Sequence, residues 1–374
     1  MKTHLTFEIL ILCALLVISV ANLAAEENWT RKADMSTQRS GFDTCIVDGK
    51  IYAIGGEIEG FGNLSLSTVE MYDPKTDTWE RKADMPTART GVSISVVDGK
   101  IYAIGGTELK RFEIDVFDKV RGEWRKVRVW DAKELPTVEM YDPVTDTWTR
   151  KTDMSAPRQT VTCVVDGKIY AIGGTATINF KEGKPTRLKT VEVYDPVTDT
   201  WAKARNMNHV RAGAAVSVVD GKIYAMGGVG WPQLPNHPGP FLSSVEVFDP
   251  KTNRWKDVAE MPTPKSLHTA SVVDGKIYII GGGFRDKGPY LYLPTIEISD
   301  PKTDRWTQAP DMPTGKDGHG AQPIDRQIYI LGGNSGGDED PLVNVEVYDT
   351  AIVRELITPI GKLLKTWAAI KMTQ

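Results

Sequence analysis

The sequence predicts an all-β fold built from six repeated units of four short strands each. A pair of glycines closes an apolar strand at six places, and a tryptophan lies 25 or 26 residues before each pair. An alternating strand that ends in aspartate follows each pair, as in Val69–Asp73. The pairs begin at Gly55, Gly105, Gly173, Gly227, Gly281 and Gly332, and the tryptophans are Trp29, Trp79, Trp148, Trp201, Trp255 and Trp306.

Each unit contains two turn signals that separate its strands. Asp98-Gly99 lies between the first two strands and is typical of a two-residue hairpin, because both turn positions need a positive φ. Asp73-Pro74-Lys75-Thr76-Asp77 lies between strands three and four, where proline fixes φ and aspartate caps backbone N–H groups. The strands therefore alternate in direction. Turns 1–2 and 3–4 lie on one face, and the longer 2–3 and 4–1 connections lie on the other, the loop face.

The glycine pair, the Tyr-Asp strand end and the spaced tryptophan closely resemble the Kelch repeat, whose period is about 50 residues. The resemblance covers residues 29–349 and implies a six-bladed β-propeller of four-stranded blades, formed by residues 26–349 as one domain. The chain starts this pattern with a fourth strand at Trp29 and ends it with a third strand, Val345–Asp349. We therefore expect the N-terminal strand to complete the last blade and close the ring.

One segment departs from the repeat. The distance from Gly105 to Trp148 is 43 residues, and the excess, near 107–137, contains Ile114–Asp118 followed by Trp124. This segment is predicted to be an extra hairpin of the strand three/four type, a half-repeat without its own glycine pair, and the sequence leaves open whether it is part of a seventh blade. The sequence does not decide whether this hairpin or Val138–Asp142 pairs with the strand before Gly105.

Composition and the chain ends restrict the functional class. The net charge is −4, which argues against nucleic-acid binding, and three cysteines do not make a disulfide scaffold. Residues 1–25 have a charged start, an apolar run over 9–21 and small residues at the end, as in a signal peptide. The run is shorter than the roughly 20 residues of a membrane span, and an uncleaved interfacial anchor is the alternative. Residues 350–374 form a tail whose role the sequence leaves open.

Strand one of every unit begins with a cation. If strand one is innermost, as the resemblance implies, these cations surround the mouth of the central channel and would attract an acidic ligand. The alternative is structural, with each cation bonded to a neighbouring blade. Two histidines follow at equivalent positions of adjacent units, and the loop face also carries aromatic residues, which suit glycans or peptide side chains but also pack loops. The candidate binding residues are Arg39, Arg89, Arg158, Arg211, Lys265, Lys316, His268, His319, Trp231 and Tyr290.

The sequence therefore predicts a secreted or periplasmic propeller that binds a protein segment or a glycan through its loop face. We expect a monomer with no membrane span in the mature chain, no cofactor and no metal, and no catalytic residue is identified. The alternative is a carbohydrate-active enzyme, since some secreted proteins of similar fold are copper-dependent galactose oxidases or sialic acid epimerases. The copper motif cannot be matched here, whereas the epimerase needs only a few acid–base residues and arginines.

Overall fold

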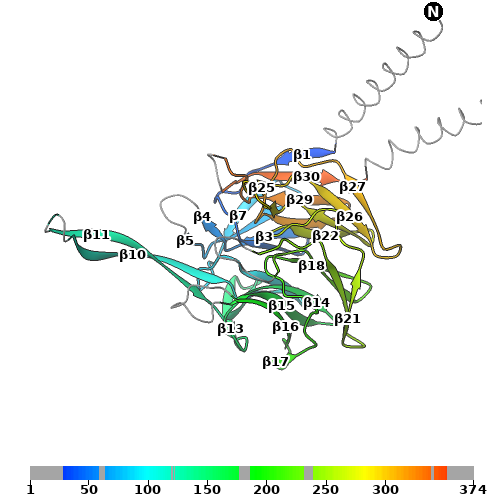
Figure 1. Cartoon of the computed structure of the whole chain (residues 1–374), viewed down its shortest axis with the longest axis horizontal. Coiled ribbons are helices and arrows are strands. Elements are labelled where there is room, and N and C mark those ends of the chain that lie inside the picture. The colour runs from blue at the N-terminus through cyan, green and yellow to red at the C-terminus, as the bar shows by residue number, and fades with distance from the viewer. Residues whose placement is uncertain are drawn as a thin grey trace, which may run out of the picture.

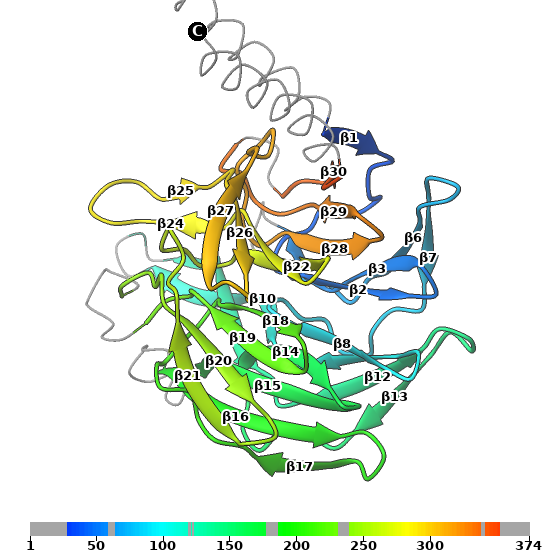
Figure 2. The same ribbon diagram turned by 90° about the vertical axis from the view of Figure 1, so that its right-hand side faces the viewer.

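The chain folds as a six-bladed β-propeller in a computed structural model that describes residues 28–58, 64–118, 121, 123–176, 186–230, 239–337 and 341–351. Figure 2 shows the radial arrangement of the strands. The predicted signal peptide and residues 352–374 of the tail lie outside the described residues. No helix within the described ranges has the length and apolar character that crossing a membrane requires.

Each blade is a four-stranded antiparallel sheet with strand one innermost, because the six first strands contact one another in sequence around the centre. Blades 1 to 3 comprise β2 (Asp43–Val47), β3 (Lys50–Ile54), β6 (Val69–Asp73) and β7 (Thr78–Lys82); β8 (Ser93–Val97), β9 (Lys100–Ile104), β12 (Val138–Asp142) and β13 (Thr147–Lys151); β14 (Gln159–Val165), β15 (Lys168–Ala176), β16 (Thr186–Asp195) and β17 (Thr200–Lys203). Blades 4 and 5 comprise β18 (Ala215–Val219), β19 (Lys222–Met226), β20 (Val245–Asp249) and β21 (Arg254–Val258); β22 (Thr269–Val273), β23 (Lys276–Ile280), β26 (Ile296–Asp300) and β27 (Arg305–Ala309).

The ring closes as the sequence predicts. Blade 6 contains β28 (Gly320–Ile324), β29 (Gln327–Leu331) and β30 (Val345–Asp349), and its outer strand is β1 (Trp29–Lys32). The pairing of Trp29 with Tyr348 brings the two ends of the repeat together. Closure covers the edge of β30, which would otherwise be exposed at the end of the chain.

The hydrophobic core lies between the blades. Buried side chains form six clusters, and each cluster joins two adjacent blades. Ile51 and Tyr72 of blade 1, for example, pack with Tyr329 of blade 6. The outer hairpins add hydrogen bonds between adjacent blades. Trp79 Nε1, for example, donates a hydrogen bond of 2.9 Å to the carbonyl of Ala33. Inter-blade packing therefore makes the disc a rigid support for its loops.

The tight turns adopt the predicted geometry. Asp98 and Gly99 have φ values of 50° and 70°, as a two-residue hairpin requires. The Asp73 carboxylate accepts a hydrogen bond of 2.9 Å from Lys75 N in the 3–4 turn. Cys45 and Cys163, the two described cysteines, are free thiols.

The extra segment near 107–137 is a long two-stranded arm and not part of a seventh blade. Its strands β10 (Thr107–Asp118) and β11 (Glu123–Glu134) pair only with each other among the described strands, and Figure 1 shows them extending away from the disc. The hairpin that completes blade 2 is β12–β13, since β12 pairs with β9. Two shorter connections of the loop face also contain strands: β4 (Glu57–Ile58) with β5 (Leu64–Ser65), and β24 (Gly283–Phe284) with β25 (Leu291–Tyr292).

Candidate functional site

The six cations that begin the first strands form buried ion pairs within their own blades. Each is exposed by only 0–2% of its surface, and each lies 2.5–3.1 Å from a glutamate in strand three. The sequence contains a signal for this pairing, because the third strand begins Val-Glu or Ile-Glu in all six units. The pairs are Arg39–Glu70, Arg89–Glu139, Arg158–Glu192, Arg211–Glu246, Lys265–Glu297 and Lys316–Glu346.

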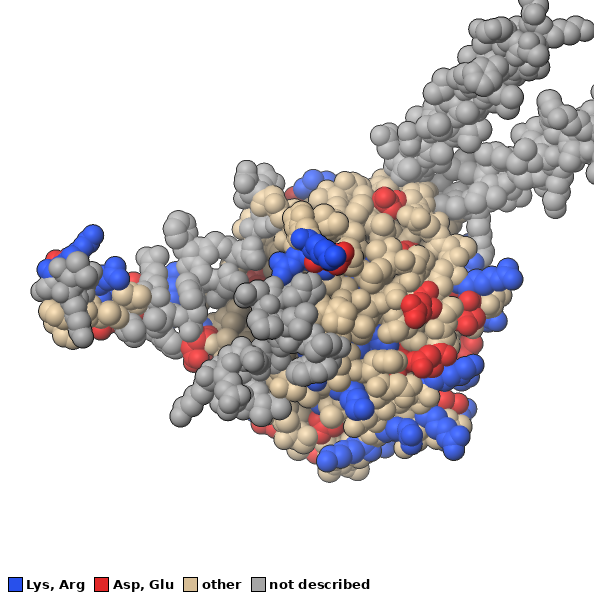
Figure 3. All heavy atoms as spheres, viewed as in Figure 1, with Lys and Arg blue, Asp and Glu red and all other residues tan. Residues whose placement is uncertain are grey.

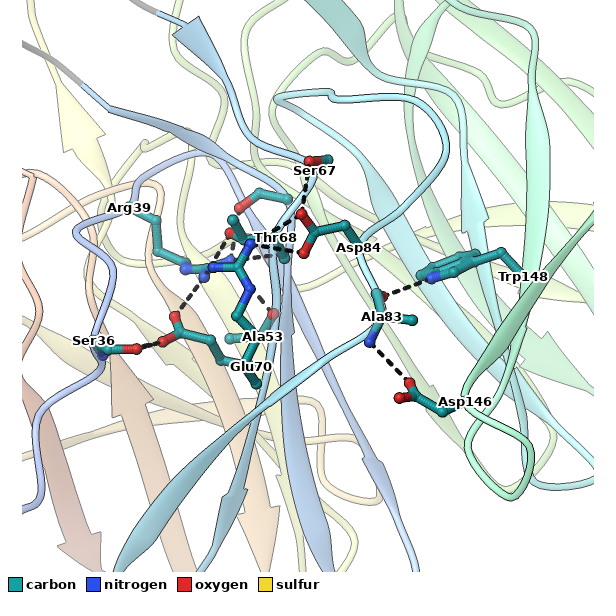
Figure 4. A network of polar contacts seen from close by, with 12 residues as sticks. Ser36, Arg39, Ala53, Ser67, Thr68, Glu70, Ala83, Asp84, Asp146 and Trp148 are labelled. Carbon is teal, nitrogen blue, oxygen red and sulfur yellow. Dashed lines mark hydrogen bonds and ion pairs between the residues drawn. The ribbon is translucent and has the colours of Figure 1, made fainter.

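Blade 1 shows the geometry of these pairs (Figure 4). Arg39 Nη2 donates to Glu70 at 2.5 Å, and Arg39 Nη1 donates to the carbonyl of Gly55 at 2.9 Å. The other Glu70 oxygen accepts a hydrogen bond from the Ser36 hydroxyl. Burial lowers the pKa of the Arg39 guanidinium, and the Glu70 charge opposes that shift. The guanidinium therefore ties strand one to strands two and three of the same blade.

This arrangement corrects the predicted role of the six cations. They do not present a ring of free positive charge at the channel mouth, since burial and the glutamates neutralise them. Their partners also belong to their own blades, where the structural alternative expected the neighbouring blade. An acidic ligand would have to break a buried ion pair to reach any of them, so the structure favours the structural role.

Backbone hydrogen bonds form an incomplete collar at the loop-face end of the channel. The collar residues precede strand one, have φ values of 55–60°, and are Gly41, Gly91, Gly213, Leu267 and Gly318. Four hydrogen bonds of 2.7–3.0 Å join them in the order Gly91, Gly41, Gly318, Leu267 and Gly213. A positive φ is ordinary for glycine but costs energy for leucine, and the Leu267 side chain is 48% exposed. The leucine is therefore the collar's unusual member.

Blade 3 leaves the gap in the collar. Arg158 and Cys163 are five residues apart, whereas Arg39 and Cys45 are six apart, so this unit lacks the residue with positive φ. Strand β14 consequently begins early, and its register shifts between Gln159 and Val161. The Gln159 side chain lies beside Gly91 and donates to Thr107 Oγ1 at 2.9 Å. The sixfold repeat is thus broken where the channel opens.

A cavity of about 290 Å³ lies beneath the collar and is lined by all six blades. Its wall mixes apolar side chains with hydroxyl and amide groups and contains few charged side chains. Ser93 and Thr162 share a hydrogen bond of 2.9 Å, and Gln322 Nε2 donates to the Thr44 carbonyl at 2.7 Å. Leu267 lines the same space from the collar. The cavity therefore suits an apolar or neutral polar group better than an anion.

His268 and His319 line this cavity from adjacent blades, as their spacing predicts. They are 4% and 2% exposed, and burial, reinforced by Lys265 and Lys316 respectively, lowers the pKa of each imidazole to about 3. His319 Nε2 lies 2.9 Å from Thr269 Oγ1. Both rings are therefore neutral at physiological pH.

Asp43 is a carboxyl group in the cavity wall that sequence reasoning missed. Its two oxygens accept hydrogen bonds of 2.7 Å from the backbone N–H groups of Thr44 and Ile94. Burial nevertheless raises the pKa of Asp43 to about 6, against those two hydrogen bonds. Since Ile94 belongs to blade 2, the carboxylate links two inner strands. No repeat pattern in the sequence indicates a carboxyl group at Asp43, because the equivalent position holds serine in blade 2 and threonine in blade 5.

A group of three possible metal ligands occurs in the described residues at His209, Glu246 and Asp257, away from the histidine pair. Glu246 already accepts a hydrogen bond of 3.0 Å from Arg211 Nε. That guanidinium opposes a second cation at the same carboxylate. The histidine pair itself has no third ligand of this kind among the described residues.

An aromatic cluster lies on the loop face beside the blade 5 side of the collar. It consists of Phe241, Phe284, Tyr290 and Tyr292, with ring centroids 5.1–6.5 Å apart. The Tyr290 hydroxyl donates to Asp317 at 2.5 Å, and burial followed by the Asp317 charge raises the pKa of Tyr290. The rings remain half-buried, so they both pack the loops and offer contact area. Trp231, the other predicted aromatic site residue, lies outside the described residues.

A signal for Leu267 was present in the sequence. The same repeat position holds glycine in four units and leucine in blade 5. An apolar side chain that replaces a repeated glycine indicates a local requirement other than backbone freedom.

Comparisons with known proteins agree with this architecture. A solved structure entitled "Structure of YjhT" superposes with a TM-score of 0.65 over 85% of this chain and 95% of that chain, at 18% identity. That likeness concerns the fold. Beta-scruin of Limulus polyphemus is 29% identical over 54% of this chain and 22% of its own length. Kelch-like protein 15 of Danio rerio is 31% identical over 52% of this chain and 33% of its own length.

A fungal relative, Kelch-like protein terF of Aspergillus terreus, is 29% identical over 59% of this chain and half of its own length. The matches thus span half or less of these curated relatives. Residues 15–228 match the KLHDC2/KLHL20/DRC7 Kelch-repeats domain, and residues 211–262 and 264–313 match the Kelch motif. With more than half of its length in the first match, the chain belongs to the Kelch repeat family.

Proposed function

We propose that this chain is a protein-binding module that holds a segment of a partner protein at its loop face. The observation that carries the proposal is the cavity beneath the collar, with an exposed leucine at its entrance. Leu267 keeps an unfavourable φ of 55° while its side chain remains 48% exposed. Strain at a surface position that packing does not require is characteristic of binding sites.

The aromatic cluster extends this site. Tyr290 lies against Gly283, whose backbone pairs with Ser266, the residue before Leu267. Leu267 is therefore next in sequence to a residue whose backbone pairs with the strand that Tyr290 packs against, so apolar groups lie near the entrance of the cavity. Such a combination suits an extended segment that inserts one side chain and lays its neighbours across the rings. Because the six buried cations are paired with glutamates, the site gives no preference to a partner segment with a strong negative charge.

The test uses a random-peptide phage library selected on the immobilised chain, followed by calorimetric affinity measurement. Leu267→Asp changes the collar, and aspartate tolerates a positive φ. Val197→Asp is the matched control, since Val197 is 89% exposed in a 3–4 turn on the opposite face. We expect Leu267→Asp to weaken a selected peptide at least tenfold and Val197→Asp to change it less than twofold. Equal effects of the two changes, or selection of no peptide, would contradict the proposal.

Secretion is also part of the proposal, and the signal-peptide pattern of residues 1–25 supports it. Expression of the full chain should give an extracytoplasmic protein whose N-terminus, read by mass spectrometry, follows Ala21 or Ala25. An intact Met1 in the mature protein would refute this assignment.

A second candidate function is acid–base chemistry on a small sugar in the cavity. Asp43 favours it, since a carboxyl group with a pKa of about 6 exchanges protons near neutral pH. The buried ion pairs count against it, because they withdraw the arginines that the epimerase alternative needs. The direct assay follows the mutarotation of sialic acid by NMR, with Asp43→Asn as control. Acceleration that disappears in Asp43→Asn would establish this function in place of simple binding.

A further inference from the structure

The arm is a long ribbon with little support from the rest of the chain. Its twelve residue pairs span roughly 40 Å at about 3.4 Å per residue, and Figure 1 shows that it projects beyond the disc. Among the described residues, its support is at the base, where Leu109 N donates to the Ser65 hydroxyl at 2.7 Å. An isolated two-stranded ribbon is marginally stable in water. A further strand along its edge would stabilise it.

Neither strand of the arm pairs with a described strand outside the arm, so both strands have an open edge. Strand β10 touches β5 near its base, whereas β11 pairs only with β10 in the part of the chain that the structure describes. A long strand with an unpaired edge presents a row of backbone N–H and C=O groups to another chain. Figure 3 shows charged side chains of both signs at the far end of the arm, so the edge has a polar surface that can select its partner.

The order of residues along β11 is self-complementary. Side chains alternate between the two faces of a strand. One face carries, in order, Glu123, Arg125, Val127, Val129, Asp131 and Lys133. The order of charges on this face is thus negative and positive, then two apolar positions, then negative and positive again. A second β11 running antiparallel places Glu123 opposite Lys133 and Arg125 opposite Asp131. All four charged side chains are exposed.

We propose that the β11 edges of two copies pair antiparallel, so that the arms join into a four-stranded sheet and the chain forms a homodimer. The contact is isologous, because each copy supplies both members of every charge pair. The dimer thus contains four opposite-charge pairs on one face, each directly across the new strand junction. The interface is small, so the dimer is weak and depends on concentration. The proposed dimer differs from the monomer that the sequence analysis expects, which stays a prediction.

Sedimentation equilibrium on the whole chain tests the proposal in a series up to roughly 1 mM, which detects complexes with dissociation constants of that size. Arg125→Asp reverses one member of two symmetric pairs, and we expect at least tenfold weaker dimerisation. The double change Arg125→Asp with Asp131→Arg restores both pairs in swapped form and should recover the dimer to within about threefold of the parent. Lys126→Asp alters the charge equally on the opposite face and should change dimerisation less than threefold.

Three results would overturn the proposal: a parent chain that stays monomeric throughout the series, a double variant that stays dissociated, or a Lys126→Asp variant as weak as Arg125→Asp. Melting temperatures measured on each variant verify that the propeller remains folded. A parent that is monomeric but binds lipid vesicles or another protein through the arm would assign the edge to that partner and refute the second copy.

Discussion

Removing the carboxylate of one buried ion pair should destabilise the propeller far more than removing a surface charge beside it. Glu139 Oε2 accepts a hydrogen bond of 2.5 Å from Arg89 Nη2, and Thr87 donates to the other oxygen at 2.7 Å. Glu139→Ala leaves the fully buried Arg89 guanidinium with neutral partners only, the carbonyls of Thr87, Gly105 and Thr137. Burial already lowers the pKa of Arg89, and Glu139 opposes that shift.

The expected cost follows from this geometry. Breaking a buried pair by removing one partner costs about 3–5 kcal/mol, because the remaining charge stays buried. With an unfolding entropy of about 2.1 cal/mol/K per residue over roughly 300 described residues, this corresponds to a Tm lower by about 5–8 °C.

Arg150→Ala is the matched control in the same blade. Arg150 lies 3.8 Å from Glu139 Oε1 and 2.6 Å from Asp153, but its side chain is 49% exposed. A surface pair of this kind contributes about 0–1 kcal/mol, so the Tm should fall by less than about 2 °C. Differential scanning calorimetry measures both variants. A Glu139→Ala protein that melts within 2 °C of the parent, or an equal loss in Arg150→Ala, would refute the reasoning.

The remaining predictions concern pH, the collar, the arm and closure. Replacing both His268 and His319 by Phe should reduce the loss of stability below pH 6.5. Because the folded pKa of each histidine is about 3, only the unfolded chain takes up protons in that range, and this lowers the free energy of unfolding. At pH 5 the effect on the free energy of unfolding, measured in urea, is roughly 2 kcal/mol per histidine. Leu267→Gly should raise the unfolding free energy by about 1 kcal/mol while weakening a selected peptide, so a less stable variant would contradict the strain argument. Deleting residues 107–134 should leave a folded propeller by circular dichroism, and loss of the cooperative melt would mean that the arm supports blade 2. Deleting residues 26–35 should lower the Tm by at least about 5 °C, since it uncovers the edge of β30, and an unchanged Tm would disprove closure.

The deletion of the arm ends at Glu134 because the structure assigns the next residues to the blade. Leu135 is buried and its N–H donates to the carbonyl of Gly106, while Thr137 accepts a hydrogen bond from Gly105 N. The predicted extra segment, 107–137, was therefore three residues too long. Those three residues are the final part of the connection between β9 and β12.

The repeat made most of the fold predictable. Glycine pairs, Asp-Gly turns and spaced tryptophans specify strand order and closure because each has a local backbone reason. The choice between two hairpins for blade 2 depended on a long-range pair instead. Strand β12 supplies Glu139 for Arg89, whereas the arm carries Asp115 at the corresponding place, one methylene shorter. Matching the six cations to six glutamates would have resolved it.

The candidate site was less predictable for two physical reasons. A basic residue at the start of a strand looks the same in sequence whether its charge faces a channel or a buried glutamate. The asymmetry of the candidate site arises from small departures, namely one missing residue before Thr160 in blade 3 and a leucine in place of glycine at Leu267. The sequence does not indicate Asp43 either, since its raised pKa depends on burial between two inner strands.

Hydrogen–deuterium exchange with a selected peptide tests the central claim, binding at the loop face, most directly. The account predicts slower exchange at residues 283–293 and at the collar around Leu267 when the peptide is bound. The 3–4 turns on the opposite face, such as 195–200, should exchange at the same rate with and without peptide. Protection confined to those turns, with none at the collar, would contradict the assignment of function to the loop face.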